Sequence, residues 1–187
     1  MSDLHATTDR RDPSPELPLP DGVWTVDPQR SEIGFAVKAL WGLHTVRGVF
    51  GTYDGTLTVQ AGCAVGRLTI GAASLDTGHG KRDRHLRSPD FFDVEPRPEI
   101  VFDAKSVTAR QGGLTVEGEL TIASTRLQLG VPVKVELMPD GAPRVSGRTT
   151  VAREAAGMTW NRLGSVGGDA VLHAHLTFTR LSGMNRG

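Results

Sequence analysis

Apolar residues recur at every second position along most of the chain, and this alternation limits the possible folds more than any other feature. Ile33, Phe35 and Val37 alternate with polar or small residues, as do the apolar residues of 114–122 and of 127–137. Successive side chains of a β-strand point to opposite faces, so a period of two is typical of a strand with one buried face. No helical period of useful length occurs, and the pattern therefore predicts an all-β fold.

The phase of this alternation predicts where strands end. The apolar positions are even in 114–122 and odd in 127–137, and a switch of this kind across 123–126 predicts a hairpin. In 49–59, Val49 and Tyr53 share one parity, which predicts that they lie on the same face. Further turn signals rich in Gly, Pro and Asp separate the runs at 61–62, 111–113, 139–141 and 167–168. We expect eight or nine strands in a closed antiparallel barrel, with a β-sandwich as the alternative.

Composition divides the chain into one domain and two tails. The 187 residues fit a single domain. Residues 1–22 hold four prolines and no aromatic residue. Proline donates no backbone hydrogen bond, and the few apolar groups here do not offset the entropy of ordering, so we expect a disordered tail over 1–22. The folded domain is expected over 23–181, with a short C-terminal tail at 182–187.

One long insertion interrupts the alternation between Leu75 and Glu99. Ser88, Pro89 and Asp90 together form a typical helix start, with serine as N-cap and proline at the first helical position. We therefore expect a short helix beginning there, anchored by the apolar pair at 91–92. A long insertion between barrel strands is either a functional lid or a cap on the end of the barrel, and both roles stay open.

Several classes of protein are disfavoured by composition. Lys plus Arg and Asp plus Glu each number 21, so the formal charge is zero and we expect no nucleic-acid partner. Cys63 is the single cysteine, which excludes an intrachain disulfide. No apolar run approaches the roughly 18 residues of a membrane span, and no segment reads as a signal peptide. We expect no stable membrane insertion and a cytoplasmic location.

The residues that could carry chemistry form no catalytic constellation. His173 and His175 have the spacing of a metal-binding pair, but the apolar residues between and beside them occupy the other face. We expect the two rings to point outward and to bind no metal. The basic run at 79–87 is a candidate anion site, yet neighbouring acids offset its charge. No nucleophile elbow, HExxH motif or phosphate-binding loop occurs, so we expect a protein that is not an enzyme.

Five segments in order give the chain a specific resemblance. They are WTVDPQRSEIGFAVK, TVRGVFGTYDGTLTV, SLDTGHGKRDRHLRSPDFFDVEPRPEIVF, VEGELTI and GMTWN, which run from 24 to 161. With these segments the chain resembles the YceI family of lipocalin-like polyisoprenoid-binding proteins. The resemblance implies an extended eight-stranded antiparallel barrel, lipocalin-like, with a short helix in the long insertion. Homodimers are common in the family, so a homodimer is possible here.

The resemblance also implies a ligand. The expected function is non-enzymatic binding, as a carrier or buffer, of a long-chain isoprenoid lipid in the apolar lumen of the barrel. No cofactor is expected to be required, and the bound lipid or quinone is a ligand. The alternatives are an isoprenoid-quinone-binding protein of redox or stress metabolism, an enzyme acting on a prenylated substrate, and a packed barrel that serves only in protein interactions.

Candidate ligand contacts follow from the resemblance and from the face on which each residue is expected. For each lining residue the alternative is an ordinary place in the barrel core. The expected lining residues are Ile33, Phe35, Val37, Leu57, Leu68, Ile70, Phe91, Phe92, Ile100, Phe102, Leu120, Ile122, Met158, Trp160, Leu172, Leu176 and Phe178. The candidate contacts to a polar head group are Arg82, Arg84 and His85.

Overall fold

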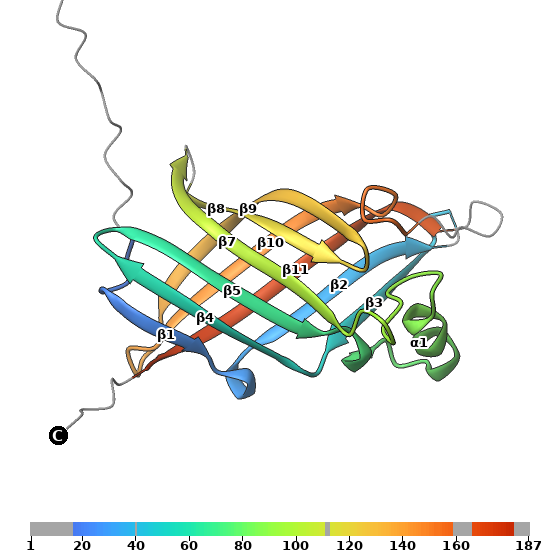
Figure 1. Ribbon diagram of the computed structural model, residues 1–187, viewed down its shortest axis with the longest axis horizontal. Coiled ribbons are helices and arrows are strands. Elements are labelled where there is room, and N and C mark those ends of the chain that lie inside the picture. The colour runs from blue at the N-terminus through green and yellow to red at the C-terminus, as the bar shows by residue number, and fades with distance from the viewer. Residues whose placement is uncertain (1–16, 40, 111–112, 159–165, 182–187) are drawn as a thin grey trace, which may run out of the picture.

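A computed structural model gives the fold, and it describes residues 17–39, 41–110, 113–158 and 166–181. The chain forms a closed antiparallel barrel, elongated along one axis, with a short helix at one end (Figure 1). The segments of the sheet are β1 (Gly22–Val26), β2 (Glu32–Ala39), β3 (His44–Phe50), β4 (Tyr53–Gln60), β5 (Cys63–Gly71), β6 (Leu75–Asp76), β7 (Glu99–Arg110), β8 (Gly113–Ile122), β9 (Thr125–Leu137), β10 (Pro143–Ala152) and β11 (Val166–Arg180).

Eleven strand segments make eight barrel strands because three strands are each interrupted once. A 3-10 turn at Pro28–Arg30 separates β1 from β2, residues 51–52 separate β3 from β4, and a second 3-10 turn at Ala72–Ser74 separates β5 from β6. The barrel closes where β11 pairs with both halves of the first strand, with β1 near its C-terminal end and with β2 along the rest. The closed barrel is confirmed, and the sandwich alternative is wrong.

The interruption at 51–52 changes which residues face the core. Phe50 is buried and Val49 is exposed, whereas Tyr53 on the next segment is buried. Val49 and Tyr53 therefore lie on opposite faces, and the prediction that they share one is wrong. The physical reason is the break itself, because Gly51 leaves the ladder, donates to the Ser74 carbonyl and lets the alternation restart one residue later.

The helix of the long insertion lies before the position predicted for it. It is α1 (Gly80–Arg87), and Ser88 is its C-cap rather than its N-cap. His79 begins the helix by accepting a hydrogen bond from the Arg82 N–H. Pro89 disfavours a helical backbone at Ser88, which places the end of α1 there. The insertion thus contains the expected helix, but the starting point at Ser88 is wrong.

Turn predictions have mixed outcomes. The hairpin across 123–126 is confirmed, since Ile122 pairs with Thr125 and Ala123 turns the chain with a φ of 49°. The turn predicted at 167–168 is wrong, because both glycines lie inside β11, at a register shift between Val166 and Ala170. Glycines are common at such irregularities, so the pair signals a bulge rather than a strand end.

Part of the segment expected to be a disordered tail lies against the barrel. Residues 1–16 and 182–187 lie outside the described residues. Leu19 is buried, and the Trp24 indole N–H donates to the Pro20 carbonyl at 3.3 Å. The expected boundary at residue 23 is therefore several residues late, because two leucines between the prolines supply apolar contacts with the barrel.

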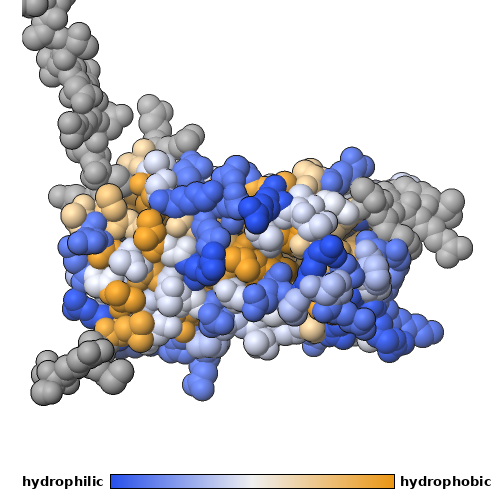
Figure 2. All heavy atoms as spheres, viewed as in Figure 1, coloured by the Kyte–Doolittle hydropathy of each residue, from blue (hydrophilic) through white to orange (hydrophobic). Residues whose placement is uncertain are grey.

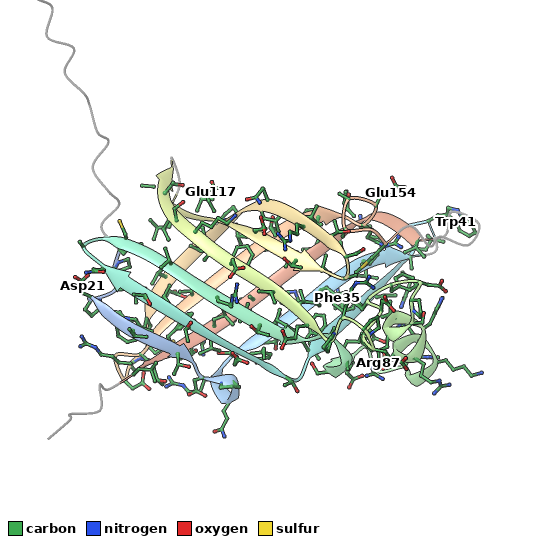
Figure 3. All side chains as sticks on the ribbon, in the orientation of Figure 1. Asp21, Phe35, Trp41, Arg87, Glu117 and Glu154 are labelled. Carbon is green, nitrogen blue, oxygen red and sulfur yellow. The ribbon has the colours of Figure 1, made fainter. Side chains whose placement is uncertain are left out.

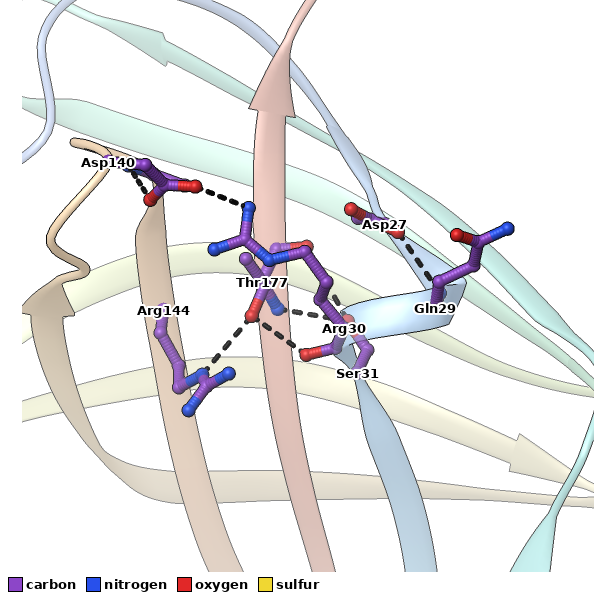
Figure 4. Close-up of polar contacts among 8 residues, drawn as sticks. Asp27, Gln29, Arg30, Ser31, Asp140, Arg144 and Thr177 are labelled. Carbon is purple, nitrogen blue, oxygen red and sulfur yellow. Dashed lines mark hydrogen bonds and ion pairs between the residues drawn. The ribbon is translucent and has the colours of Figure 1, made fainter.

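A polar network holds the break between β1 and β2 against the closing strand (Figure 4). Thr177 on β11 is fully buried; its N–H donates to Ser31 Oγ at 2.9 Å, and its hydroxyl donates to the Arg30 carbonyl at 2.9 Å. Arg144 Nε donates to the same hydroxyl at 3.1 Å. The Arg30 guanidinium pairs with Asp140 at 2.7 Å. Backbone groups that the interruption leaves without ladder partners thus find side-chain partners.

Candidate binding site

The inward faces of the strands enclose one elongated apolar cavity. Its volume is about 400 Å³, and nearly all of its surface is apolar. Small residues on the inward faces leave this space, because they fill less of the interior than leucine or phenylalanine would. The small lining residues include Ala64, Ala104, Gly147, Ala170 and Ala174.

The residues expected to line a lumen do line this cavity, with one position outside the described residues. Trp160 is that position. The other sixteen belong to β2, β4, β5, β7, β8 and β11, to the segment after α1, and to the turn that contains Met158. This placement is geometric and does not test whether any of them contacts a ligand.

Aromatic rings gather at the end of the cavity next to α1. The ring of Phe92 lies 6.0 Å from that of Phe50, nearly perpendicular to it, and 6.4 Å from that of Phe35. Phe35 and Phe50 are 5.8 Å apart. Edge-to-face and tilted pairs at these separations are favourable beyond the area that they bury. The insertion therefore packs onto the barrel through its aromatic pair and forms part of the cavity wall.

The three expected head-group residues lie in different surroundings. His85 lines the cavity, with its ring edge-on to Phe91 at 5.1 Å and its Nε2 3.3 Å from Asp90. Arg82 also lines the cavity, and its guanidinium donates to the hydroxyl and the carbonyl of Thr77 at 2.7 and 2.8 Å. Arg84 is exposed and is not among the residues of the cavity wall, so its contact with a head group stays a prediction that this geometry does not favour. It lies on the solvent side of α1.

Arg153, which sequence reasoning missed, is a further basic residue on the cavity wall. It is only 5% exposed, and its guanidinium lies 5.9 Å from the centre of the Phe91 ring. It donates to the carbonyls of Gly167 and Met158 at 3.0 and 3.3 Å. Burial lowers the pKa of this arginine from its ordinary value. The alternation contained the signal, because 153 continues the inward parity of Val151 and the residues before it.

Phe91 therefore has a basic side chain on two sides, His85 at its edge and Arg153 over its face. Among the described residues that line the cavity, none is Asp or Glu. Such an arrangement favours an apolar ligand whose polar end carries acceptor oxygens. A buried guanidinium is stabilised by an acceptor, and a carboxylate on the wall would compete with the ligand for that guanidinium.

The N-terminal segment contributes residues that were also missed. Leu17 and Leu19 line the cavity, although both fall within the segment expected to be disordered. The signal was weak, because alternating leucine and proline fit an unfolded tail as well as an extended segment that packs on a barrel.

The histidine pair lies on the outer surface of β11. His175 Nδ1 is 2.9 Å from Ser146 Oγ, and His173 Nε2 is 3.5 Å from Glu32 Oε1. The two ring centres are 6.3 Å apart. Within the part of the chain that the structure describes, no group of three or more potential metal ligands occurs.

Comparison with known proteins places the chain in a family. The model of the YceI-like domain matches residues 24–178, which is most of the chain. The chain belongs to the YceI family. Among curated relatives, the UPF0312 protein plu2095 of Photorhabdus laumondii is 36% identical over 116 residues, and YceI of Escherichia coli O157:H7 is 33% identical over 97 residues. The first match covers 60% of this chain and 59% of the relative, so the chain spans about three-fifths of that relative's length.

Solved YceI-like structures share the fold. BcnA of Burkholderia cenocepacia superposes with a TM-score of 0.74 at 22% identity, over 82% of this chain and 99% of that one. A polyisoprenoid binding domain from Saccharophagus degradans, implicated in plant cell wall breakdown, gives a TM-score of 0.68 at 12% identity, over 84% and 98%. No helix in the described residues is both long and apolar enough to cross a membrane.

Proposed function

We propose that this YceI-family protein binds one long-chain isoprenoid lipid in the barrel cavity and catalyses no reaction on it. The cavity carries the proposal, because it is continuous, almost wholly apolar and large enough for a ligand. Its volume of about 400 Å³ lies within the roughly 300–1,000 Å³ of small-molecule sites. The polyisoprenoid binding domain of Saccharophagus degradans has the same fold and supports the same ligand class.

The physical basis of binding is burial of hydrocarbon. A prenyl chain offers few polar groups, so its affinity grows with the apolar area removed from water, at about 25 cal/mol per Å². The cavity wall has few directional groups along most of its length and suits a chain recognised by length and thickness. The proposed role is that of a carrier or buffer, which holds the lipid out of water.

The polar end of the ligand is proposed to lie at Phe91, between His85 and Arg153. Both a prenyl phosphate and an isoprenoid quinone present acceptor oxygens that suit a guanidinium. The absorbance of the extracted ligand separates these alternatives, since a quinone absorbs in the near ultraviolet and a plain prenyl chain does not.

The experiment is to fill the cavity with a side chain and to measure binding of a long-chain polyprenol. Ala174 lies on the cavity wall at the middle of β11, and His175 lies next to it on the outer face. Ala174→Phe places a ring in the cavity, and we expect it to weaken polyprenol binding at least about tenfold, since several buried methylenes lose their place at about 0.8 kcal/mol each.

His175→Phe is the matched control, because it introduces the same phenyl ring on the exposed face of the same strand. It should bind polyprenol as the unaltered protein does. Overpacking in Ala174→Phe costs about 1–3 kcal/mol of stability, so circular dichroism and a melting curve confirm that the variant is folded. Equal binding by a folded Ala174→Phe variant and by the control would contradict a ligand in this cavity.

A further inference from the structure

The hairpin between β2 and β3 presents large apolar side chains to solvent. Trp41 is 74% exposed and Leu43 is 88% exposed, and only Gly42 separates them. Isolated exposed apolar residues are common and need no explanation. Here, however, a tryptophan and a leucine occupy the tip of one turn, where neither contributes to the core of the barrel.

The backbone at this tip is unfavourable for tryptophan. Trp41 has a φ of 55°, in the left-handed region that glycine adopts most easily. Its own side chain is solvent-exposed, so packing within the barrel does not compensate for this conformation. A residue that is both strained and exposed suggests a role in contacts with another molecule, since it does not stabilise the barrel.

Basic side chains surround the two apolar ones. Residues 38–47 contain Lys38, His44 and Arg47 and no aspartate or glutamate. All three are exposed, and they lie on the two strands of the hairpin, Lys38 on β2 and the others on β3. The hairpin therefore has an apolar tip, and basic side chains lie on the two strands that lead to it.

The helix α1 adds basic side chains at the same end of the barrel, where neighbouring acids such as Asp90 offset part of their charge. The short strand β6 pairs antiparallel with β3, so the chain that leaves it runs back toward the hairpin, and α1 follows. Lys81 and Arg84 are exposed on this helix, and Figure 2 shows its surface as hydrophilic. Figure 3 places Trp41 and Arg87 at the α1 end of the molecule, with the acid Glu154 on the side of the hairpin away from α1.

We propose that this end of the barrel docks on the anionic surface of a lipid bilayer. Tryptophan and leucine at the tip would enter the interface between head groups and acyl chains, where tryptophan is favoured. The lysine and arginine side chains of the hairpin and α1 would contact anionic head groups. Apolar insertion combined with basic contacts is the usual composition of a surface that binds membranes reversibly.

The docking end is also the end at which Phe91, His85 and Arg153 line the cavity. A lipid that moved between bilayer and cavity at this end would avoid crossing water. The docking proposal rests on the hairpin and α1 alone, so its test does not depend on which ligand the cavity binds.

The test is flotation of the purified full chain with vesicles of phosphatidylcholine in which one quarter of the lipid is phosphatidylglycerol. We expect the unaltered protein to float with these vesicles, less with pure phosphatidylcholine, and less again at high salt, because salt screens exposed charges. Trp41→Gly should weaken binding at least about fivefold, since it removes the larger apolar anchor. Its melting temperature should be unchanged or higher, because glycine relieves the backbone strain.

Leu137→Ser is the matched control. Leu137 is 62% exposed and pairs with Pro143 on β10. The next residue of β10, Arg144, pairs with Thr177, which lies near the C-terminal end of β11. Leu137 therefore lies at the opposite end of the barrel from the hairpin. Lys81→Glu combined with Arg84→Glu should lower binding to the anionic vesicles and leave binding to pure phosphatidylcholine unchanged.

Any of four results would overturn the proposal. The first is no flotation with either vesicle, and the second is equal flotation with both. The third is a loss in Leu137→Ser as large as that in Trp41→Gly. If Trp41→Gly instead changes the oligomeric state in size-exclusion chromatography without altering flotation, the hairpin is a contact between copies of this chain and the proposal is wrong.

Discussion

Single residues decide how the barrel closes, and Thr177 shows this best. The first barrel strand breaks at the 3-10 turn between β1 and β2, and a break exposes backbone groups that a continuous ladder would satisfy. Thr177 binds Arg30 and Ser31 from the closing strand, while the Tyr53 hydroxyl donates to the Ser31 carbonyl at 2.5 Å. Burial raises the pKa of Tyr53 from its ordinary value. Sequence alone did not identify this network, because its members are ordinary polar residues that lie far from one another in the chain.

Thr177→Val should destabilise the protein by about 1–3 kcal/mol, since valine keeps the shape but leaves the Arg30 carbonyl and the Arg144 guanidinium without this partner. Thr179→Val is the control, because Thr179 is exposed two residues along the same strand and its loss should cost under about 0.5 kcal/mol. Urea unfolding followed by circular dichroism measures both. Equal midpoints for the two variants would contradict the assigned role of the network.

Strands are the level at which the sequence was most informative. Alternation identified the inward side chains of β7, β8, β9 and β11, because a regular strand in a barrel has one solvent-exposed face and one buried face. It failed at Val49, where a two-residue break restarts the phase, and at 167–168, where glycines lie in a bulge. Helix α1 was misplaced because Ser-Pro-Asp fits a helix start and a helix stop equally well. Local sequence patterns thus predict the strands, but they do not show where a strand is interrupted by a break or a bulge.

Close packing between strands β7 and β8 gives a prediction at this scale. Gly118 on β8 lies under the ring of Phe102, and a Cβ there would approach that ring to 2.7 Å and the Asp103 carbonyl to 2.5 Å. Gly118→Ala should therefore cost about 1–3 kcal/mol. Gly51→Ala is the control, since its nearest neighbour would be 3.7 Å away. A thermal melt compares them, and a Gly118→Ala variant as stable as Gly51→Ala would show that the two strands are more loosely packed than described.

The whole molecule has a property that no element has, namely the space inside it. Parity predicted most of the side chains that face inward, and the described residues among those expected to line a lumen do lie on the cavity wall. Whether facing side chains meet or leave a gap depends on their summed volumes and on the barrel radius, which alternation does not encode. The buried Arg153 and the N-terminal leucines likewise become visible only when the ends of the barrel are assembled. The site was therefore predictable along its length and not at its two ends.

The central claim is that this space holds a long apolar lipid. Native mass spectrometry of the freshly purified chain, followed by solvent extraction and mass identification of what is released, tests it most directly. The account predicts a species heavier than the chain by the mass of one isoprenoid lipid, which reverts to the mass of the chain after extraction. The mass of the chain alone under every gentle setting, with no lipid in the extract, would contradict it.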